Sequence, residues 1–301
     1  MIKMPERLKD LREIPTCPLE ARVLLVHKHA AERARLAVDY IKNEYPQCKI
    51  FAAARDFADH DLIDCMRSDF ESLGRVWLFP AAEASDELSE CLNRLLDCSY
   101  KSSRDNMRRA LELVLVGVFF SHSHISPEDA QCWLNSTRGT PYFSRVVKDL
   151  SVLPRFERLN VDQNWADAIS QFCWGLCDTI HTKGQRHSLR ELQPVHTTIN
   201  SIRILEFNEA ALRDSLDLYL ETVSHIAVIL AAYNPVLLVG LPLLQKFADN
   251  PPLSGFFEEH QAEILWKLIP MHYHSSLRHM VETDQEILSV KEWMNGLPDK
   301  F

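Results

Sequence analysis

The sequence predicts an α/β protein in which a five-stranded, parallel, doubly wound sheet is followed by an all-α domain. Two observations predict this fold class. Up to about residue 182, short apolar runs of strand length alternate with amphipathic helical segments. From residue 208 onward, only helical periodicity is present. A chain of 301 residues that is 46% hydrophobic and 25% charged has the composition of a globular protein with about two domains.

The predicted strands are apolar runs bounded by polar residues, a pattern typical of strands that are covered on both faces. Each is followed by residues at helical spacing, so right-handed crossover helices would cover the sheet. One helix start is explicit, because Ser126-Pro127 followed by two acidic residues has the pattern of an N-cap with proline at the first helical position. The predicted strands are Arg22 to Val26, Lys49 to Ala53, Arg75 to Phe79, Leu111 to Phe120 and Arg155 to Val161.

The chain divides into four predicted parts. Residues 1–20 form an N-terminal leader, 21–182 the α/β domain, 183–207 a polar linker and 208–301 the helical domain. Within the helical domain, Ile226 to Leu244 carries no charge over a length that nearly spans a bilayer. Because Asn234-Pro235 disfavours a continuous helix, we expect a buried helix, a corner and a second buried helix there. A membrane-associated segment is the alternative.

Charge and cysteine usage limit the classes of partner and compartment. The net charge of −9 and the pI near 5.8 argue against a nucleic-acid-binding protein, which needs a basic surface. The basic stretch Lys101 to Arg109 is interpreted as a solvated helix start. The eight cysteines form no CxxC pair, which indicates core residues in a reducing compartment. The N-terminus lacks the apolar run of a signal peptide, so we expect a cytoplasmic protein.

The predicted sheet lacks the glycines that phosphate-binding loops require. The loop after the first strand is His27-Lys28-His29, and no glycine precedes Gly74. This excludes a phosphate cradle and a dinucleotide fingerprint. A phospho-acceptor receiver is also excluded, because the first and third strands are followed by His27 and by Phe79-Pro80 instead of acidic residues.

Part of the chain resembles the TIR (Toll/interleukin-1 receptor) family. CKIFAAARDF, LIDCMRSDFES and RVWLF resemble the strand before the family's second box, the helix after it and the third strand. VLLVHKHAAERARLAVDYI is similar to the first strand and helix, and LNVDQNWADAISQF to the closing strand and helix. The resemblance covers about residues 21–182. It implies a flavodoxin-like or TIR-like sheet whose loop Arg55 to Asp61 mediates self-association or covers a ligand.

The resemblance also implies a candidate site for cleavage of the nicotinamide glycosidic bond of NAD, as in an NAD nucleosidase. Enzymes of the family use a glutamate in the helix after the third strand, where its carboxylate stabilises positive charge on the ribose as nicotinamide leaves. Here Cys91 stands where that glutamate belongs, and the candidate catalytic residues are the nearby Glu90 and Glu87. No cofactor is expected, and NAD is the possible substrate. The candidate nucleotide-binding residues are His27, Lys28, Arg55, Asp56 and Phe57.

The sequence leaves other readings open. One is a non-catalytic adaptor that associates with its own copies or with a TIR-like partner through Arg55 to Asp61, and another is a membrane-associated effector acting through 226–244. No metal site is expected, because each cluster of possible ligands lacks a third ligand or the necessary spacing. These clusters are His122 with His124, and His272 with His274 and His279; Cys173 with Cys177 and Glu258-Glu259 with His260 are likewise interpreted as core and surface residues.

Overall fold

The computed structural model describes residues 18–65, 74–122, 125–181, 183–184, 196–199, 202–247 and 255–299. Within these residues the fold is all-α apart from one antiparallel hairpin, so the predicted five-stranded parallel sheet is wrong. Every predicted strand lies in a helix. The helices concerned are α1 (Pro18–Asn43), α2 (Cys48–Asp56), α3 (Gly74–Leu96), α4 (Tyr100–Phe120) and α7 (Pro154–Gln163).

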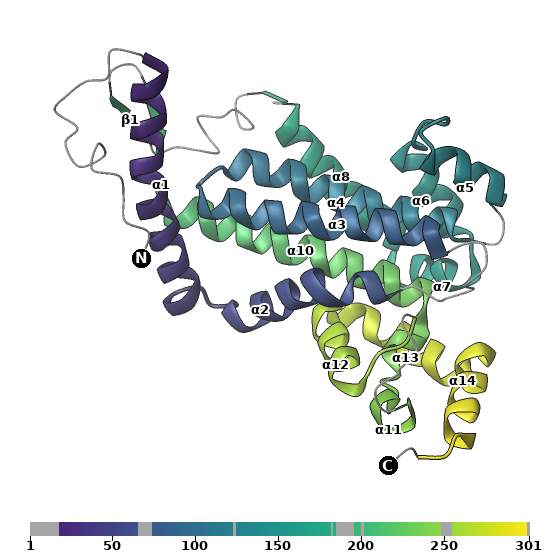
Figure 1. Cartoon of the computed structure of the whole chain (residues 1–301). Helices are drawn as coiled ribbons and strands as arrows, with labels where there is room; N and C mark the ends of the chain where they lie inside the picture. The colour runs from purple at the N-terminus through teal and green to yellow at the C-terminus, as the bar shows by residue number, and fades with distance from the viewer. Residues whose placement is uncertain are drawn as a thin grey trace.

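Helix α4 explains why an apolar run was mistaken for a strand. Its second half, Leu111 to Phe120, is buried on almost every side, because α4 packs against α3, α8 (Trp165–Ile180) and α10 (Glu209–Tyr233). A helix enclosed by neighbours is apolar all round and shows no 3.6-residue period. Figure 1 shows α3, α4 and α10 lying side by side, with α8 along α4.

Helices α3 and α4 approach each other closely at Gly117. A Cβ atom at this position would lie 2.8 Å from the ring of Trp77 and 2.9 Å from Pro80, both on α3. Trp77 is buried and donates from Nε1 to the carbonyl oxygen of Ile63 at 3.3 Å. The absent side chain at Gly117 therefore makes room for a fixed indole ring.

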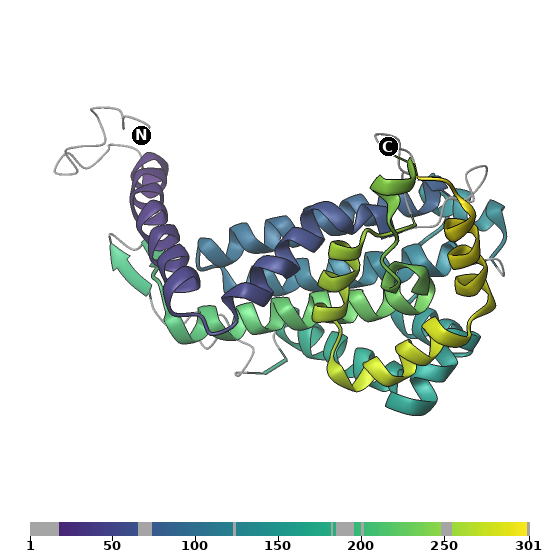
Figure 2. The same ribbon diagram turned by 90° about the horizontal axis from the view of Figure 1, so that it is seen from below.

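At one end of the helical body, a buried arginine links α1 to the end of α3 and to a short hairpin. Helix α1 crosses the ends of the long helices (Figures 1 and 2), and Arg33 on α1 is only 5% exposed. Its guanidinium donates to Asp97 Oδ1 at 2.5 Å and to the carbonyl oxygen of Leu205 at 3.0 Å. Leu205 ends the hairpin formed by β1 (His196–Ile199) and β2 (Ile202–Leu205), which lies within the predicted linker.

The predicted loop Arg55 to Asp61 is helical. Arg55 and Asp56 end α2, and the chain continues through the π-helix η2 (Phe57–Asp61) and the short 3₁₀ helix η3 (Ile63–Cys65). Of LIDCMRSDFES, the segment that resembles the helix after the family's second box, residues 66–72 fall outside the described residues.

Two predicted helix boundaries are confirmed, a helix start at Ser126-Pro127 and a helix end at Asn234-Pro235. Ser126 caps α5 (Pro127–Leu134) by accepting from the Asp129 backbone N–H at 3.1 Å, with Pro127 at the first helical position. Helix α10 ends at Tyr233, and Pro235 begins the 3₁₀ helix η5 (Pro235–Leu238). Proline fixes its own φ and restricts the residue before it, so both helix boundaries follow from local chemistry.

The rest of the chain is also helical, and it includes α6 (Phe143–Ser151) before α7. After η5 come α11 (Leu243–Phe247), α12 (Glu259–Leu268), η6 (Met271–Tyr273), α13 (His274–Thr283) and α14 (Gln285–Gly296). Residues on both sides of the predicted linker share one hydrophobic core, from Ala37 on α1 to Met280 on α13. Among the described residues, α10 is the one helix long and apolar enough to cross a membrane; 72% of its most apolar window is buried within the protein.

Candidate functional site

The predicted catalytic carboxylates lie on α3 and are held by other side chains. Glu87 accepts from Asn106 Nδ2 at 2.5 Å and from Arg109 Nε at 2.9 Å, both on α4. Glu90 forms an ion pair of 2.6 Å with Arg94, one turn later on the same helix. These contacts tie α3 to α4 and stabilise α3 itself, as ion pairs at i,i+4 spacing do.

The predicted nucleotide-binding residues are divided between two elements. His27 and Lys28 are exposed on α1. Arg55 and Asp56 are about half-exposed and pair with each other at 2.7 Å, whereas Phe57 is fully buried. The structure does bring this segment beside α3, because Ser89 donates to Asp59 at 2.9 Å. These residues line neither of the two pockets described next.

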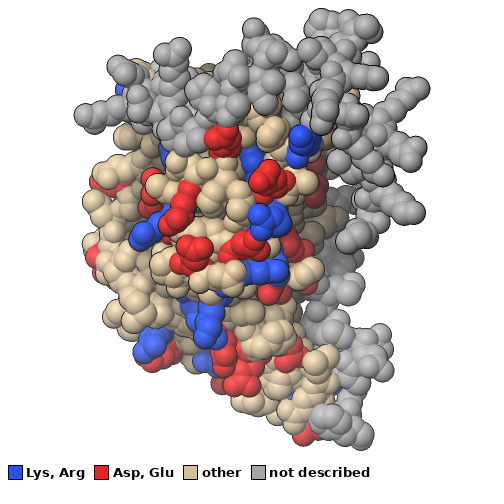
Figure 3. Space-filling model, turned by 90° about the vertical axis from the view of Figure 1, so that its left-hand side faces the viewer, with Lys and Arg blue, Asp and Glu red and all other residues tan. Residues whose placement is uncertain are grey.

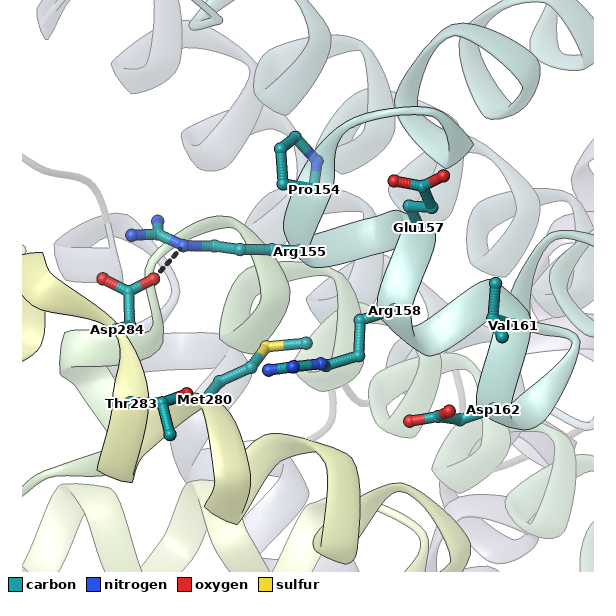
Figure 4. Close-up of a pocket in the computed structure, with 9 residues that line it drawn as sticks. All are labelled: Pro154, Arg155, Glu157, Arg158, Val161, Asp162, Met280, Thr283 and Asp284. Atoms are coloured by element: carbon teal, nitrogen blue, oxygen red, sulfur yellow. Dashed lines mark hydrogen bonds and ion pairs between the residues drawn. The ribbon is translucent and has the colours of Figure 1, made fainter.

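The larger of these pockets is a groove of about 490 Å³ between α7 and α13 (Figure 4). Its most strongly held side chain is Arg155, which donates to Asp284 at 2.8 Å, to Glu286 at 2.5 Å and to the Tyr233 carbonyl oxygen at 3.1 Å. All of its guanidinium nitrogens are therefore engaged in joining α7 to the ends of α10 and α13 and to α14. We interpret the groove as a consequence of this joint between helices.

The second pocket, of about 340 Å³, lies between α8, α10 and η6, and we call it the α8–α10–η6 pocket. Phe172 on α8 stacks at 4.7 Å between ring centroids on His225 of α10. Glu221 lies one turn before His225, and Tyr273 closes the pocket from η6. The complete lining is Ala168, Gln171, Phe172, Glu221, Ser224, His225, Pro270, His272 and Tyr273.

Three ionisable groups of this pocket have shifted pKa values. Burial, reinforced by His272, lowers the pKa of His225 to about 4, so its imidazole is neutral at pH 7. Burial raises the pKa of the Glu221 carboxyl and that of the Tyr273 phenol. A pocket that combines several groups with perturbed pKa values is a candidate functional site.

The Tyr273 hydroxyl is the clearest sign that the pocket is built for a ligand. Tyr273 is 2% exposed, and its Oη atom has no hydrogen-bond partner among the described residues. An unpaired buried hydroxyl costs about 1–3 kcal/mol, so the hydroxyl of a residue that lines a pocket is a candidate for pairing with a ligand. At pH 7 the pocket offers the neutral imidazole of His225, the ring of His272, a phenol, an amide and a hydroxyl as hydrogen-bonding groups, beside one carboxylate.

The pKa of His225 predicts a measurable pH dependence of stability. Between pH 6.5 and 4 the unfolded chain takes up a proton that the folded chain does not, so the free energy of unfolding decreases as the pH is lowered. His225→Gln removes this contribution. On acidification from pH 7.5 to 5, we expect the wild type to lose about 1–2 kcal/mol more than this variant in urea unfolding. His279→Gln, at an exposed position on α13, should behave as the wild type; equal losses in all three proteins would contradict a half-buried, neutral His225.

The other clusters named from the sequence lie as follows among the described residues. Of the first pair, His124 lies outside the described residues. His274 contacts the Ile269 carbonyl oxygen through Nε2 at 3.0 Å, and His272 packs on Tyr273. The described residues contain no group of three or more His, Cys, Asp or Glu side chains able to hold a metal ion. Cys173 is buried as expected, and burial together with Cys177 raises its thiol pKa, which disfavours a nucleophilic role.

Neither the surface charge nor the comparisons with known proteins assign this chain to a family. On the face seen in Figure 3, basic and acidic side chains are interspersed without a large patch of one sign. Comparisons with family models, with curated proteins and with solved structures find no match to this chain.

Proposed function

We propose that this protein binds a small organic molecule in the α8–α10–η6 pocket. The observation that carries the proposal is a pocket of about 340 Å³ lined by Tyr273, whose buried hydroxyl has no partner among the described residues. This volume is at the lower end of the range for small-molecule sites, which favours a ligand of one or two rings. Phe172 and His225 supply flat apolar surface for such a ring.

The test compares two tyrosines that both have a buried, unpartnered hydroxyl, of which one lines the pocket and the other does not. Tyr219 is also fully buried with an unpartnered hydroxyl, but it does not line the pocket. A fragment library is screened by ligand-observed NMR against the wild type, Tyr273→Phe and Tyr219→Phe. We expect hits shared by the wild type and Tyr219→Phe to bind Tyr273→Phe about fivefold more weakly, the effect of one hydrogen bond of about 1 kcal/mol. Melting temperatures should not fall in Tyr273→Phe, because it loses an unpaired polar atom.

Two results would refute this function. One is a screen in which no fragment binds the wild type. The other is a set of hits that bind both variants as tightly as the wild type, because their site would then lie away from Tyr273. The predicted cleavage of NAD, association through Arg55 to Asp61, homo-oligomerisation and cytoplasmic localisation stay predictions. The α8–α10–η6 pocket does not depend on any of them.

A further inference from the structure

Glu221 distinguishes the α8–α10–η6 pocket from an ordinary apolar pocket. Three carboxylates on the long helices pair with an arginine: Glu87 with Arg109, Glu90 with Arg94 and Glu112 with Arg108. Glu221 has no lysine or arginine within ion-pair distance among the described residues. Partial desolvation by its neighbours raises the pKa of its carboxyl. Glu221 is nevertheless exposed on α10, so a ligand can reach the carboxylate and a bound cation would pair with it.

The groups that line the pocket together with Glu221 also favour a cation. Phe172 and His225 contribute rings to the lining, and a cation within about 6 Å of a ring face is attracted by the ring quadrupole. The unpartnered Tyr273 oxygen can accept a hydrogen bond from an ammonium N–H. His225 is neutral at pH 7, and no lysine or arginine lines the pocket. An anionic ligand would meet the Glu221 carboxylate with no fixed positive charge in compensation.

We propose that the ligand of the α8–α10–η6 pocket is an organic amine, in which a protonated nitrogen pairs with Glu221 and an attached ring packs on Phe172. The ammonium group lies between the Glu221 carboxylate and the Tyr273 hydroxyl. This inference rests on the proposed small-molecule function and adds the chemical class of the ligand. The α7–α13 groove does not provide the same combination, because Asp284, which lines the groove, already pairs with Arg155, whose side chain is 25% exposed and pairs with Glu286 as well.

The experiment uses three probes of the same shape and different charge. Phenethylamine, 2-phenylethanol and phenylacetate are titrated into the full chain at pH 7.5 and followed by NMR chemical shifts. We expect phenethylamine to bind about tenfold more tightly than 2-phenylethanol, the combined effect of one partly exposed ion pair and one cation–π contact. Phenylacetate should bind most weakly.

Variants assign the selectivity to one carboxylate. Glu221→Gln keeps the shape of the side chain and removes its charge, and we expect it to bind phenethylamine and 2-phenylethanol within about twofold of each other. The control is Glu263→Gln on α12, where the carboxylate is 63% exposed and pairs with Lys267 at 3.6 Å; it should keep the wild-type preference. Equal melting temperatures of the two variants would show that both fold.

Each alternative outcome has a defined meaning. If the wild type binds 2-phenylethanol or phenylacetate as well as the amine, the inference is wrong and the pocket remains a small-molecule site. The same holds if no probe binds while Tyr273-dependent fragments do. If Glu221→Gln keeps a tenfold preference for the amine, another group selects the charge and the role of Glu221 is refuted. If neither the probes nor any fragment binds, the proposed function fails together with the inference.

Discussion

Replacing Asn234 by aspartate is expected to lower the free energy of unfolding by about 3–5 kcal/mol, the range for an uncompensated buried charge. Asn234 is fully buried at the corner between α10 and η5. Its Nδ2 donates to the carbonyl oxygens of Cys65 at 3.2 Å and Gly255 at 3.0 Å. Aspartate has the same shape, but its carboxylate would face both carbonyl oxygens without a proton to donate. Urea unfolding at pH 7.5 measures the effect.

The matched control is Asn135→Asp. Asn135 is an exposed residue at the end of α5 that accepts from Gln131 Nε2 at 3.1 Å, an acceptor role that a carboxylate retains. We expect a change within about 0.5 kcal/mol, as for most surface substitutions. A loss below about 1 kcal/mol in Asn234→Asp would contradict the burial of the amide between the two carbonyl oxygens.

Gly117→Ala should destabilise the protein by about 2–3 kcal/mol, the cost of forcing extra atoms into a packed core. Alanine normally favours a helix over glycine by about 1 kcal/mol. Here the added methyl group would lie 2.8 Å from the buried ring of Trp77, so α3 and α4 would have to separate. Thermal unfolding together with the near-UV circular dichroism of the tryptophans would detect both the loss and its location.

A second helical glycine gives the opposite expectation. Gly175 on α8 is exposed, and a Cβ there would have no atom within 4 Å beyond its own helix and chain neighbours. Gly175→Ala should therefore stabilise the protein by up to about 1 kcal/mol. If both substitutions stabilise, the close approach of α3 and α4 at Gly117 is not present in solution.

The sequence could predict those features that depend on neighbouring residues alone. The Ser126-Pro127 helix start and the Asn234-Pro235 corner are of this kind. The strands were predicted wrongly because an apolar run of strand length has no measurable period, so a segment of an enclosed helix looks the same. The run from Leu111 to Phe120 shows this, because α3, α8 and α10 bury it from several sides.

The candidate site could be predicted even less, since its parts come from distant segments. Glu221 and His225 stand at i,i+4 spacing within an apolar helix, and this signal was available in the sequence. His272 was noticed, but as part of a histidine cluster. Nothing local indicates that Tyr273 is buried and shares a pocket with Phe172, because η6 is brought to α8 and α10 by tertiary packing. The predicted site at Glu87 and Glu90 depended on a sheet edge that the described residues lack.

A crystal of the full chain soaked with phenethylamine tests the central claim most directly. The account predicts density for one molecule in the α8–α10–η6 pocket, with its nitrogen between the Glu221 carboxylate and the Tyr273 hydroxyl and its ring on Phe172. Density in the α7–α13 groove alone, or an unoccupied pocket at a concentration that saturates the protein in solution, would contradict it.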